Sequence, residues 1–159
     1  MLLFLHKEKA MFSKACEYAI RALIYIAQQN NLGNRTSLKD IADAIESPEA
    51  FTAKILQKLV HNRIITSLKG PNGGFSIDPE KIEETKLIHI VSAIDGDGIR
   101  RNCALGLKEC GEVFPCPLHH KFKIIREQIE LMLTSTSLKA LLGKLEEGNA
   151  FIKIPGTLL

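Results

Sequence analysis

Apolar residues recur at helical intervals in the first part of the chain. Between residues 12 and 29 they occupy positions 12, 15, 16, 19, 20, 23, 24 and 27, which predicts one helix with a wide buried face. The Asn and Gly residues of the 30–35 segment are expected to end this helix. A shorter helix is predicted over 37–45, because Ser37 and Asp40 have the spacing of a capping box.

The segment 47–62 predicts a third helix with a strong start signal. Ser47 is expected to be the N-cap and Pro48 to take the first helical position. One face is apolar and consists of Phe51, Ile55, Leu56, Leu59 and Val60. The polar residues expected outside that face are Thr52, Lys54, Gln57, Lys58 and His61. Two short helices in close succession after a longer one outline a helix-turn-helix.

A β-hairpin is expected within 64–77, where two β-like runs flank the sequence GPNGG. Gly70, Gly73 and Gly74 permit positive φ, and Pro71 fixes its own φ. Helix, helix-turn-helix and hairpin in this order predict a winged helix. Its face is locally basic, because the charged residues over 48–77 are Lys54, Lys58, Arg63 and Lys69 against the single acid Glu49.

The second half of the chain predicts three further segments. A short helix over 85–96, capped by Thr85, precedes an irregular stretch over 97–116. A long amphipathic helix is expected from Pro117 to about Leu133, and a last small helix follows the TSTS sequence at 134–137. We expect the long helix to pair with its copy in a two-fold dimer, with folding back onto its own domain as the alternative. The predicted fold class is mainly α with a small β-hairpin wing: a winged helix-turn-helix plus a long dimerisation helix.

Composition adds limits on class and location. The chain has 159 residues, 45% hydrophobic and 25% charged, with a formal charge of +3 that is compatible with nucleic acid. No apolar run approaches the roughly 20 residues that span a bilayer, and the N-terminal apolar cluster lacks the order of a secretory signal. We therefore expect a cytoplasmic protein without membrane contact. The expected parts are an extension over 1–10 that could be disordered, a winged-helix DNA-binding domain over 11–96, a cysteine loop over 97–116, a dimerisation helix with a small terminal helix over 117–147, and a tail over 148–159.

Three of the four cysteines, Cys103, Cys110 and Cys116, lie in the irregular stretch. In a cytosolic protein such a cluster indicates a metal site or reactive thiols more often than disulfides. The gaps of six and five residues do not match the two to four typical of zinc ligand pairs, which ranks structural zinc low. A disulfide would join only two of the three.

Thiolate is the form of cysteine that binds metal, and two features would favour it here. Cys116 lies at the expected start of the long helix, where the dipole and the free amides favour an anion. Arg100 and Arg101 precede Cys103. The fourth cysteine, Cys16, falls on the apolar face of the first helix and is expected to be a buried core thiol.

Several motifs together resemble the Rrf2 family of bacterial transcription regulators. They are Tyr18-Ala19, SLKDIA at 37–42, GPNGGF at 70–75, and Ile94-Asp95-Gly96 ahead of a cysteine-bearing loop and a long helix. The resemblance covers roughly residues 11–145. It implies a homodimeric winged-helix DNA binder that is not an enzyme. Similarity to the IscR-like and NsrR-like members implies an iron–sulfur cluster, with [2Fe–2S] favoured over [4Fe–4S].

By that resemblance, Cys103, Cys110 and Cys116 are the cluster ligands. The fourth ligand is expected to be His119, which matches the histidine of IscR-like members; Glu17 of the partner subunit is the alternative, as in NsrR-like members. The first cysteine gap is one residue longer than in the IscR-like pattern, so the cluster type stays open. A nitrogen or oxygen ligand in place of sulfur shifts the potential and makes a cluster easier to lose, which suits a sensor.

The expected mechanism places the 48–62 helix in the major groove of a pseudo-palindromic double-stranded DNA site and the hairpin beside the minor groove. The predicted DNA-binding residues are Ser37, Thr52, Lys54, Gln57, Lys58, Lys69, Gly70, Pro71, Asn72 and Gly73. Cluster loading would set DNA affinity, with repression the favoured outcome. The alternatives are a cluster-free thiol-redox-sensing regulator, a protein-binding adaptor, and a metal- or thiol-dependent redox enzyme, which no C-x-x-C pair or phosphate loop supports.

Overall fold

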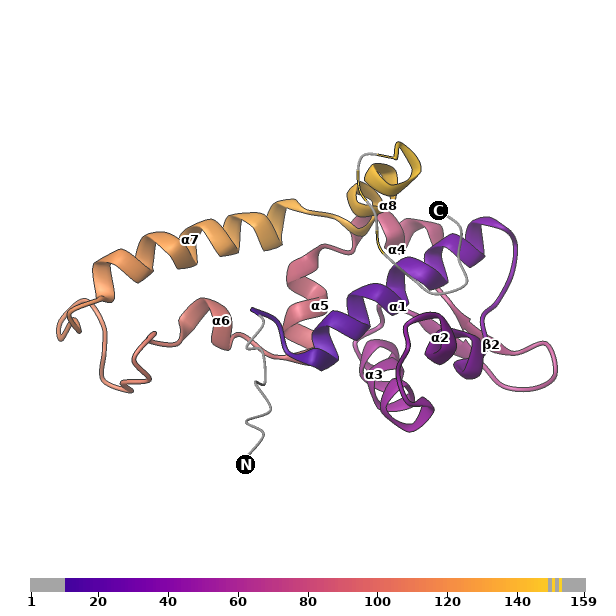
Figure 1. Cartoon of the computed structure of the whole chain (residues 1–159), viewed down its shortest axis with the longest axis horizontal. Helices are drawn as coiled ribbons and strands as arrows, with labels where there is room; N and C mark the ends of the chain where they lie inside the picture. Colours follow the sequence, from indigo (N-terminus) through magenta and orange to yellow (C-terminus); the bar gives the residue numbers. More distant parts are fainter. Residues whose placement is uncertain (1–10, 149, 151, 153–159) are drawn as a thin grey trace, which may run out of the picture.

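The computed structural model describes residues 11–148, 150 and 152 (Figure 1). The predicted 1–10 extension and most of the tail lie outside these residues. The elements are α1 (Lys14–Asn31), α2 (Leu38–Ala44), α3 (Glu49–His61), β1 (Thr66–Leu68), β2 (Gly74–Ser76), α4 (Pro79–Glu84), α5 (Leu87–Ile94), α6 (Gly98–Arg101), α7 (His119–Ser135) and α8 (Leu138–Glu146). The predicted class, helical with one small hairpin, is confirmed. Within the described residues, no helix is long and apolar enough to cross a membrane.

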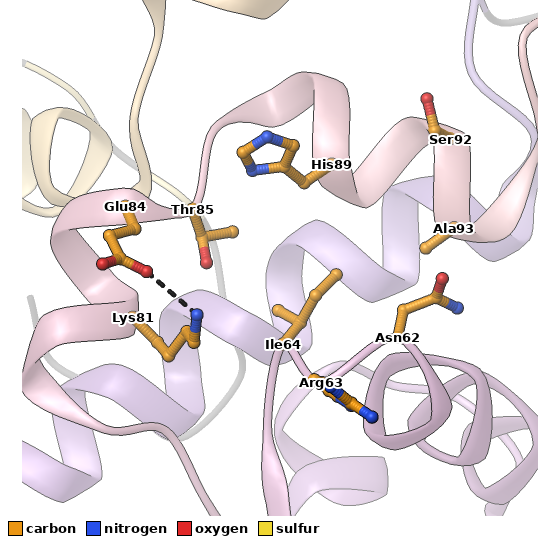
Figure 2. Close-up of a pocket in the computed structure, with 9 residues that line it drawn as sticks. All are labelled: Asn62, Arg63, Ile64, Lys81, Glu84, Thr85, His89, Ser92 and Ala93. Atoms are coloured by element: carbon orange, nitrogen blue, oxygen red, sulfur yellow. Dashed lines mark hydrogen bonds and ion pairs between the residues drawn. The ribbon is translucent and has the colours of Figure 1, made fainter.

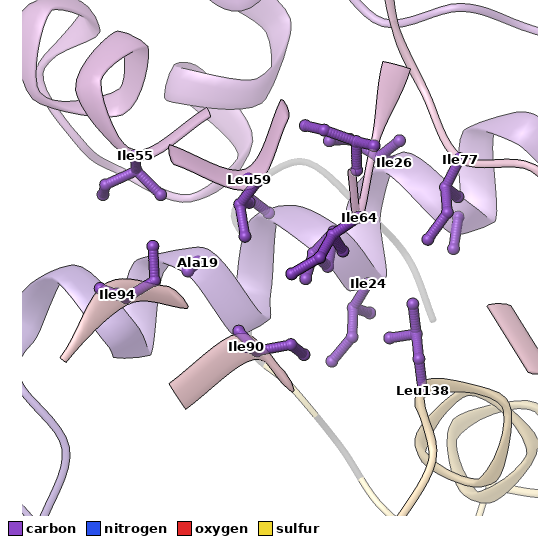
Figure 3. Close-up of a cluster of buried hydrophobic side chains, with 14 of the residues drawn as sticks. Ala19, Ile24, Ile26, Ile55, Leu59, Ile64, Ile77, Ile90, Ile94 and Leu138 are labelled. Carbon is purple, nitrogen blue, oxygen red and sulfur yellow. The ribbon is translucent and has the colours of Figure 1, made fainter. Parts of the chain in front are cut away.

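The core is built around α1. The Ser13 hydroxyl caps this helix by accepting a hydrogen bond from the Cys16 amide at 3.1 Å. Cys16 is fully buried, which confirms the prediction of a core thiol, and burial raises its pKa to about 12. Apolar side chains from the rest of the fold pack together with α1 (Figure 3), among them Ile55, Leu59, Ile64, Ile77, Ile90, Ile94 and Leu138.

The helix-turn-helix formed by α2 and α3 packs against α1. Ser37 caps α2 as predicted, because its hydroxyl accepts a hydrogen bond from the Asp40 amide at 3.1 Å. The predicted cap of α3 is wrong: Pro48 takes the N-cap position and the helix begins at Glu49. Ser47 belongs to the preceding turn, since its amide donates to the Ala42 carbonyl at 3.0 Å and its side chain is buried.

The wing consists of β1, β2 and the 69–73 loop between them, and its strands pair antiparallel as expected. Phe75 ties the wing to the segment before α2, because its amide donates to the Thr36 carbonyl at 2.8 Å. Close backbone contacts leave no room for a side chain at two glycines of the wing. A Cβ on Gly74 would lie 2.7 Å from the Thr36 oxygen, and one on Gly73 would lie 2.2 Å from the Leu68 oxygen.

The second half of the chain departs from the prediction at its element ends. The helix α4 was not expected, and α5 begins at Leu87 with Lys86 as its N-cap, so the predicted cap Thr85 is wrong. Thr85 instead ends α4 and connects it to α8, because its carbonyl accepts a hydrogen bond from the Leu138 amide at 2.8 Å. One short helix, α6, lies in the stretch predicted to be irregular.

The long helix α7 begins at His119, two residues later than predicted, and ends at Ser135. It contacts α5 and α6 and extends from the rest of the fold, with the cysteine loop (97–116) leading to its distal end (Figure 1). Its buried residues are His119 and Leu133. Most of α7 therefore has no packing partner within the described protomer.

Candidate metal centre and nucleic-acid interface

The three loop cysteines and His119 converge at the N-terminal end of α7. The Sγ atoms of Cys103 and Cys116 are 3.7 Å apart, and the Cys110 Sγ lies 3.3 Å from Nδ1 of His119. All three sulfur atoms lie within 4.8 Å of one another. Cys116 and His119 are buried, at 8% and 7% exposure, and the other two cysteines are partly covered. Residues separated by up to 16 positions thus form one compact set of donors.

Backbone turns hold this arrangement. The Gly106 amide donates to the Cys103 carbonyl at 2.9 Å, and the His119 amide donates to the Cys116 carbonyl at the same distance. Gly106 has a φ of 71°, a conformation that glycine adopts without strain. The Cys116 amide donates to the Cys110 sulfur at 3.4 Å. His119 therefore lies one turn beyond Cys116, and the turn directs its ring toward the sulfurs.

The thiols differ in their electrostatic surroundings. Hydrogen bonds from the backbone amides of Leu107 and Leu105 lower the pKa of Cys103 to about 7. The Cys116 amide likewise lowers the pKa of Cys110, but burial and the neighbouring cysteines outweigh it and leave that pKa raised. The loop therefore stabilises the thiolate of Cys103 more than that of Cys110.

The predicted sources of positive charge are used elsewhere. Arg100 pairs with Asp97 and with Glu130 of α7 at 3.0 Å, and Arg101 pairs with Asp97 at 3.6 Å. The helix α7 also begins at His119, two residues after the predicted start at Pro117, so Cys116 lies farther from the helix end than expected. Arg100 thus joins α6 to α7, whereas Arg101 pairs within α6 and its N-cap. The amides of the loop itself, which no spacing pattern revealed, stabilise the thiolate.

This donor set fits the group that the sequence implies. Cysteine thiolates are the usual ligands of iron–sulfur clusters, and an imidazole nitrogen can replace a sulfur ligand. The three sulfurs lie together here, and Nδ1 of His119 lies beside one of them, that of Cys110. The alternative fourth ligand, Glu17, lies in α1 and pairs with Lys14 at 2.8 Å. Its predicted role concerns the partner subunit and stays a prediction.

Glu112 is a residue of the site that sequence reasoning missed. Its Oε1 lies 3.5 Å from Nε2 of His119 and 2.7 Å from Nζ of Lys123. The hydrogen bond from Lys123 and the nearby His119 ring lower the pKa of Glu112. Nε2 of His119 is itself buried and has no well-formed hydrogen bond to any described residue. No sequence motif marks this glutamate, because only the path of the loop brings its carboxylate to His119.

The predicted DNA-contact residues differ in their exposure and in their contacts within the protein. Lys54, Gln57 and the wing-tip residues Lys69, Gly70, Pro71 and Asn72 are exposed, while Gly73 is half-buried. Ser37 is exposed but its hydroxyl serves the cap of α2. The prediction that Thr52 faces outward is wrong, because this residue has 0% exposure. Lys58 is exposed, and its Nζ donates to the Ile94 carbonyl at 3.3 Å.

A groove of about 540 Å³ separates α3 from the wing. Its lining residues are Gln57, Val60, His61, Ser67, Leu68, Lys69, Gly74 and Phe75. Both walls thus carry residues from the elements expected to contact DNA. His61, which was expected to be exposed but was not assigned to DNA, belongs to this surface.

A second depression, of about 370 Å³, lies between the end of α3, α4 and α5 (Figure 2). Several of its polar side chains already have partners. Lys81 pairs with Glu84 at 2.9 Å, the Asn62 amide group donates to the Lys58 carbonyl at 2.8 Å, and Ser92 donates to Asp97 at 3.0 Å. This depression therefore gathers few unpaired groups for a ligand.

Comparisons with known proteins agree on one family. The family model "Rrf2: Iron-dependent Transcriptional regulator" matches residues 12–144. A protein of Aquifex aeolicus named as a helix-turn-helix (HTH) type transcriptional regulator is 32% identical over 146 residues, which cover 89% of this chain and 96% of the relative. The HTH-type transcriptional regulator IscR of Photorhabdus laumondii is 23% identical and aligns over 81% of this chain and 77% of its own.

Solved structures share the fold. CymR, the global cysteine regulator of B. subtilis, superposes with a TM-score of 0.70 at 20% identity, covering 85% of this chain and 98% of CymR. IscR of T. potens superposes with a TM-score of 0.67 at 22% identity, covering 88% of this chain and 91% of that protein. These similarities support the winged-helix architecture.

Proposed function

The chain belongs to the Rrf2 family of transcriptional regulators. From this premise we propose that it is a homodimeric DNA-binding regulator whose DNA affinity is set by an iron–sulfur cluster. The proposed ligands are Cys103, Cys110, Cys116 and His119, and the proposed cluster is [2Fe–2S]. The observation that carries the proposal is the convergence of three sulfurs and the Nδ1 of His119 at one end of α7. A cytoplasmic location goes with a protein that acts on DNA.

The proposed DNA-contacting surface consists of α3 and the wing. Exposed Lys54 and Gln57 are placed to meet bases or phosphates in the major groove, and Lys69 with the glycine-rich tip is placed to meet the flanking backbone. Thr52 is not part of this surface because it is buried. The groove between α3 and the wing is lined by both elements and is continuous with this surface.

The proposed dimer interface follows α7. Its exposed apolar residues form two pairs separated by seven positions, and so lie along one stripe of the helix: Ile124 with Leu131, and Ile125 with Met132. The opposite face of α7 carries Leu133, which has 0% exposure. A helix that is packed on one side and apolar on the other needs a second partner, and a copy of itself satisfies this by two-fold symmetry.

When bound, the cluster supplies a redox- or occupancy-dependent link between its four ligands. The chain itself supplies the connection to DNA. Arg100 joins α6 to Glu130 of α7, and Lys58 joins α3 to the Ile94 carbonyl at the end of α5, just ahead of the loop. Ordering of the loop would therefore shift how the two α3 helices of a dimer are spaced. Such a shift can be only as large as the difference in cluster affinity between the two arrangements.

The test is anaerobic purification of the full chain followed by metal and DNA analysis. We expect iron and acid-labile sulfide at about two each per protomer, as in a [2Fe–2S] cluster, with visible absorbance. Cys110→Ser should lose both, whereas Cys16→Ala, which removes the thiol outside the loop, should keep them. Zinc without sulfide, or a colourless protein without iron, would contradict the proposal. Protein with the cluster and protein without it should bind a palindromic DNA site with different affinities.

A cluster-free thiol sensor is the second candidate, favoured by one distance and one pKa. The sulfurs of Cys103 and Cys116 are 3.7 Å apart, and the pKa of Cys103 is lowered to about 7. A peroxide could oxidise the Cys103 thiolate to a sulfenic acid, and attack by the Cys116 thiol would then form a disulfide with release of water. DNA binding that responds to peroxide in protein without iron or sulfide would support this candidate.

A further inference from the structure

We propose that Glu112 is a positioning residue for the metal centre, which accepts a hydrogen bond from Nε2–H of His119 and so presents Nδ1 of the same ring to the three thiols. The inference rests on the proposed function, because it assigns the orientation of one of the proposed ligands. Glu112 itself stays outside the ligand set.

The two nitrogens of His119 have different neighbours. Nδ1 lies 3.3 Å from the Cys110 sulfur, on the side of the donor set. Nε2 points away from it, is buried, and has no well-formed hydrogen bond to a described residue. A neutral imidazole carries one proton, so a ring that ligates through Nδ1 carries it on Nε2. A buried N–H group needs an acceptor, and the Oε1 of Glu112 at 3.5 Å is placed to become one.

Lys123 holds the carboxylate in this place. It lies four residues after His119 on α7, which puts both side chains on the same face of the helix. Its Nζ lies 2.7 Å from the same Oε1 that faces the histidine. Glu112 is thereby fixed between two α7 residues although it belongs to the loop. The result is a chain of contacts from Lys123 through Glu112 and His119 to Cys110.

This arrangement has a defined effect on a bound metal. A carboxylate that accepts the second N–H of a histidine ligand fixes the ring orientation and raises the basicity of the ligating nitrogen. A more basic ligand and a nearby anion both favour the more highly charged, oxidised iron. Glu112 is therefore expected to slow loss of iron and to lower the reduction potential of the centre.

A separate cation site is the competing interpretation. Glu112, His119 and His120 carry ligand atoms within 4.8 Å of one another. A cation there would have to displace Lys123, which occupies the carboxylate at 2.7 Å. His120 is also exposed, so the space beside it is open to water. We therefore assign the carboxylate to His119, and a separate cation is one outcome that the experiment detects.

The experiment compares Glu112→Gln with Glu109→Gln in the full, anaerobically purified protein. Both substitutions remove one negative charge from the same loop, but Glu109 has no ion pair or hydrogen bond with any described residue. We expect a chelator to remove iron about 10- to 100-fold faster from Glu112→Gln, with a more positive reduction potential. Glu109→Gln should match the wild type in both. Lys123→Gln, which leaves the carboxylate unanchored, should show a smaller change in the same direction.

The ligating nitrogen is identified separately, by pulsed electron paramagnetic resonance of the reduced protein with ¹⁵N at Nδ1 or at Nε2 of histidine. Strong coupling to Nδ1 is expected, and strong coupling to Nε2 would overturn the inference. Equal rates of iron loss and equal potentials in the Glu112→Gln and Glu109→Gln variants would overturn this inference but leave the proposed function standing. Binding of one additional zinc ion that is lost in Glu112→Gln would do the same, because it would show a separate cation site. A wild-type protein without iron and sulfide would instead overturn the proposed function and this inference together.

Discussion

Nζ of Lys58, on the outer side of α3, donates a hydrogen bond to the backbone carbonyl of Ile94 at 3.3 Å. This contact joins the helix proposed to contact DNA to the last residue of α5. The next residue, Asp95, accepts a hydrogen bond from the Ser13 amide at 3.0 Å, so α1 is tied to the same point. Three helices therefore meet where the chain turns toward the cysteine loop, and Lys58 has a structural role that its charge alone did not indicate.

This contact distinguishes Lys58 from Lys54, which is exposed on the same helix and has no such partner among the described residues. We expect Lys54→Met to reduce the slope of log K against log salt by about one, the amount for one lost phosphate contact. Lys58→Met should leave that slope unchanged and lower the free energy of unfolding by roughly 0.5 kcal/mol, the size of one weak hydrogen bond. Anisotropy titrations with DNA over a salt series and urea unfolding measure the two quantities. A slope change in Lys58→Met as large as in Lys54→Met would contradict the assignment.

Replacing Thr52 should stabilise the protein, in contrast to replacing Lys58. Its side chain is fully buried and its hydroxyl has no hydrogen-bond partner in the described part of the chain. Valine has nearly the same shape without the unpaired polar group, so Thr52→Val should raise the free energy of unfolding by about 1 kcal/mol. Its DNA affinity should equal that of the wild type, whereas Gln57→Ala should weaken binding. Urea unfolding and DNA titration test both; a stable Thr52→Val protein with weakened DNA binding would restore Thr52 to the DNA-contacting surface.

The sequence predicted most of the elements because their signals are local. The apolar positions of α1 mark one face of a single helix, and the glycines of the wing mark a single turn. Thr52 was misplaced because residue type was given more weight than spacing: it precedes Ile55 and Leu56 by three and four positions and so shares their buried face.

The caps and the site geometry depend on contacts between distant segments. Ser47 and Thr85 are residue types that commonly cap helices, but their backbones are engaged elsewhere. The Ser47 amide donates to the Ala42 carbonyl of α2, and the Thr85 carbonyl accepts from the Leu138 amide of α8. The three cysteines could be proposed as a set from their number and surroundings. The position of Glu112 beside His119 could not, since it follows from the path of the loop and from Lys123 on α7.

The exposed stripe of α7 yields a prediction about assembly. Leu131 is 61% exposed in the protomer and belongs to the proposed dimer interface. Leu131→Glu places a charge where a partner would exclude water, so the dimer dissociation constant should rise by more than about 10-fold, or about 1.4 kcal/mol. Leu32→Glu makes the same change at a residue 71% exposed at the end of α1 and should leave the dimer intact.

Sedimentation velocity over a concentration series measures the dissociation constant of each variant. Circular dichroism should show that Leu131→Glu keeps its helices, because the side chain is largely exposed in the protomer. A dimer of unchanged affinity would place the interface elsewhere. A folded monomer with weak binding to a palindromic site would support both the interface and the need for two α3 helices on the DNA.

The thiols of the unloaded protein should react in a defined order. The pKa of Cys103 is lowered to about 7 by amide hydrogen bonds, whereas burial raises that of Cys16 to about 12. Since the thiolate is the nucleophile, alkylation of Cys103 by iodoacetamide should accelerate about 10-fold between pH 6 and pH 8 as the thiol of pKa about 7 ionises, and level off above that range. Cys16, with 0% exposure, should stay unmodified while the protein is folded. Peptide mass spectrometry after short labelling pulses resolves the sites, with urea-unfolded protein as the control in which Cys16 reacts. A Cys103 rate that keeps rising through pH 9 would show that the amides of Leu105 and Leu107 do not hold its thiolate, and the thiol-sensing alternative would lose its most reactive residue.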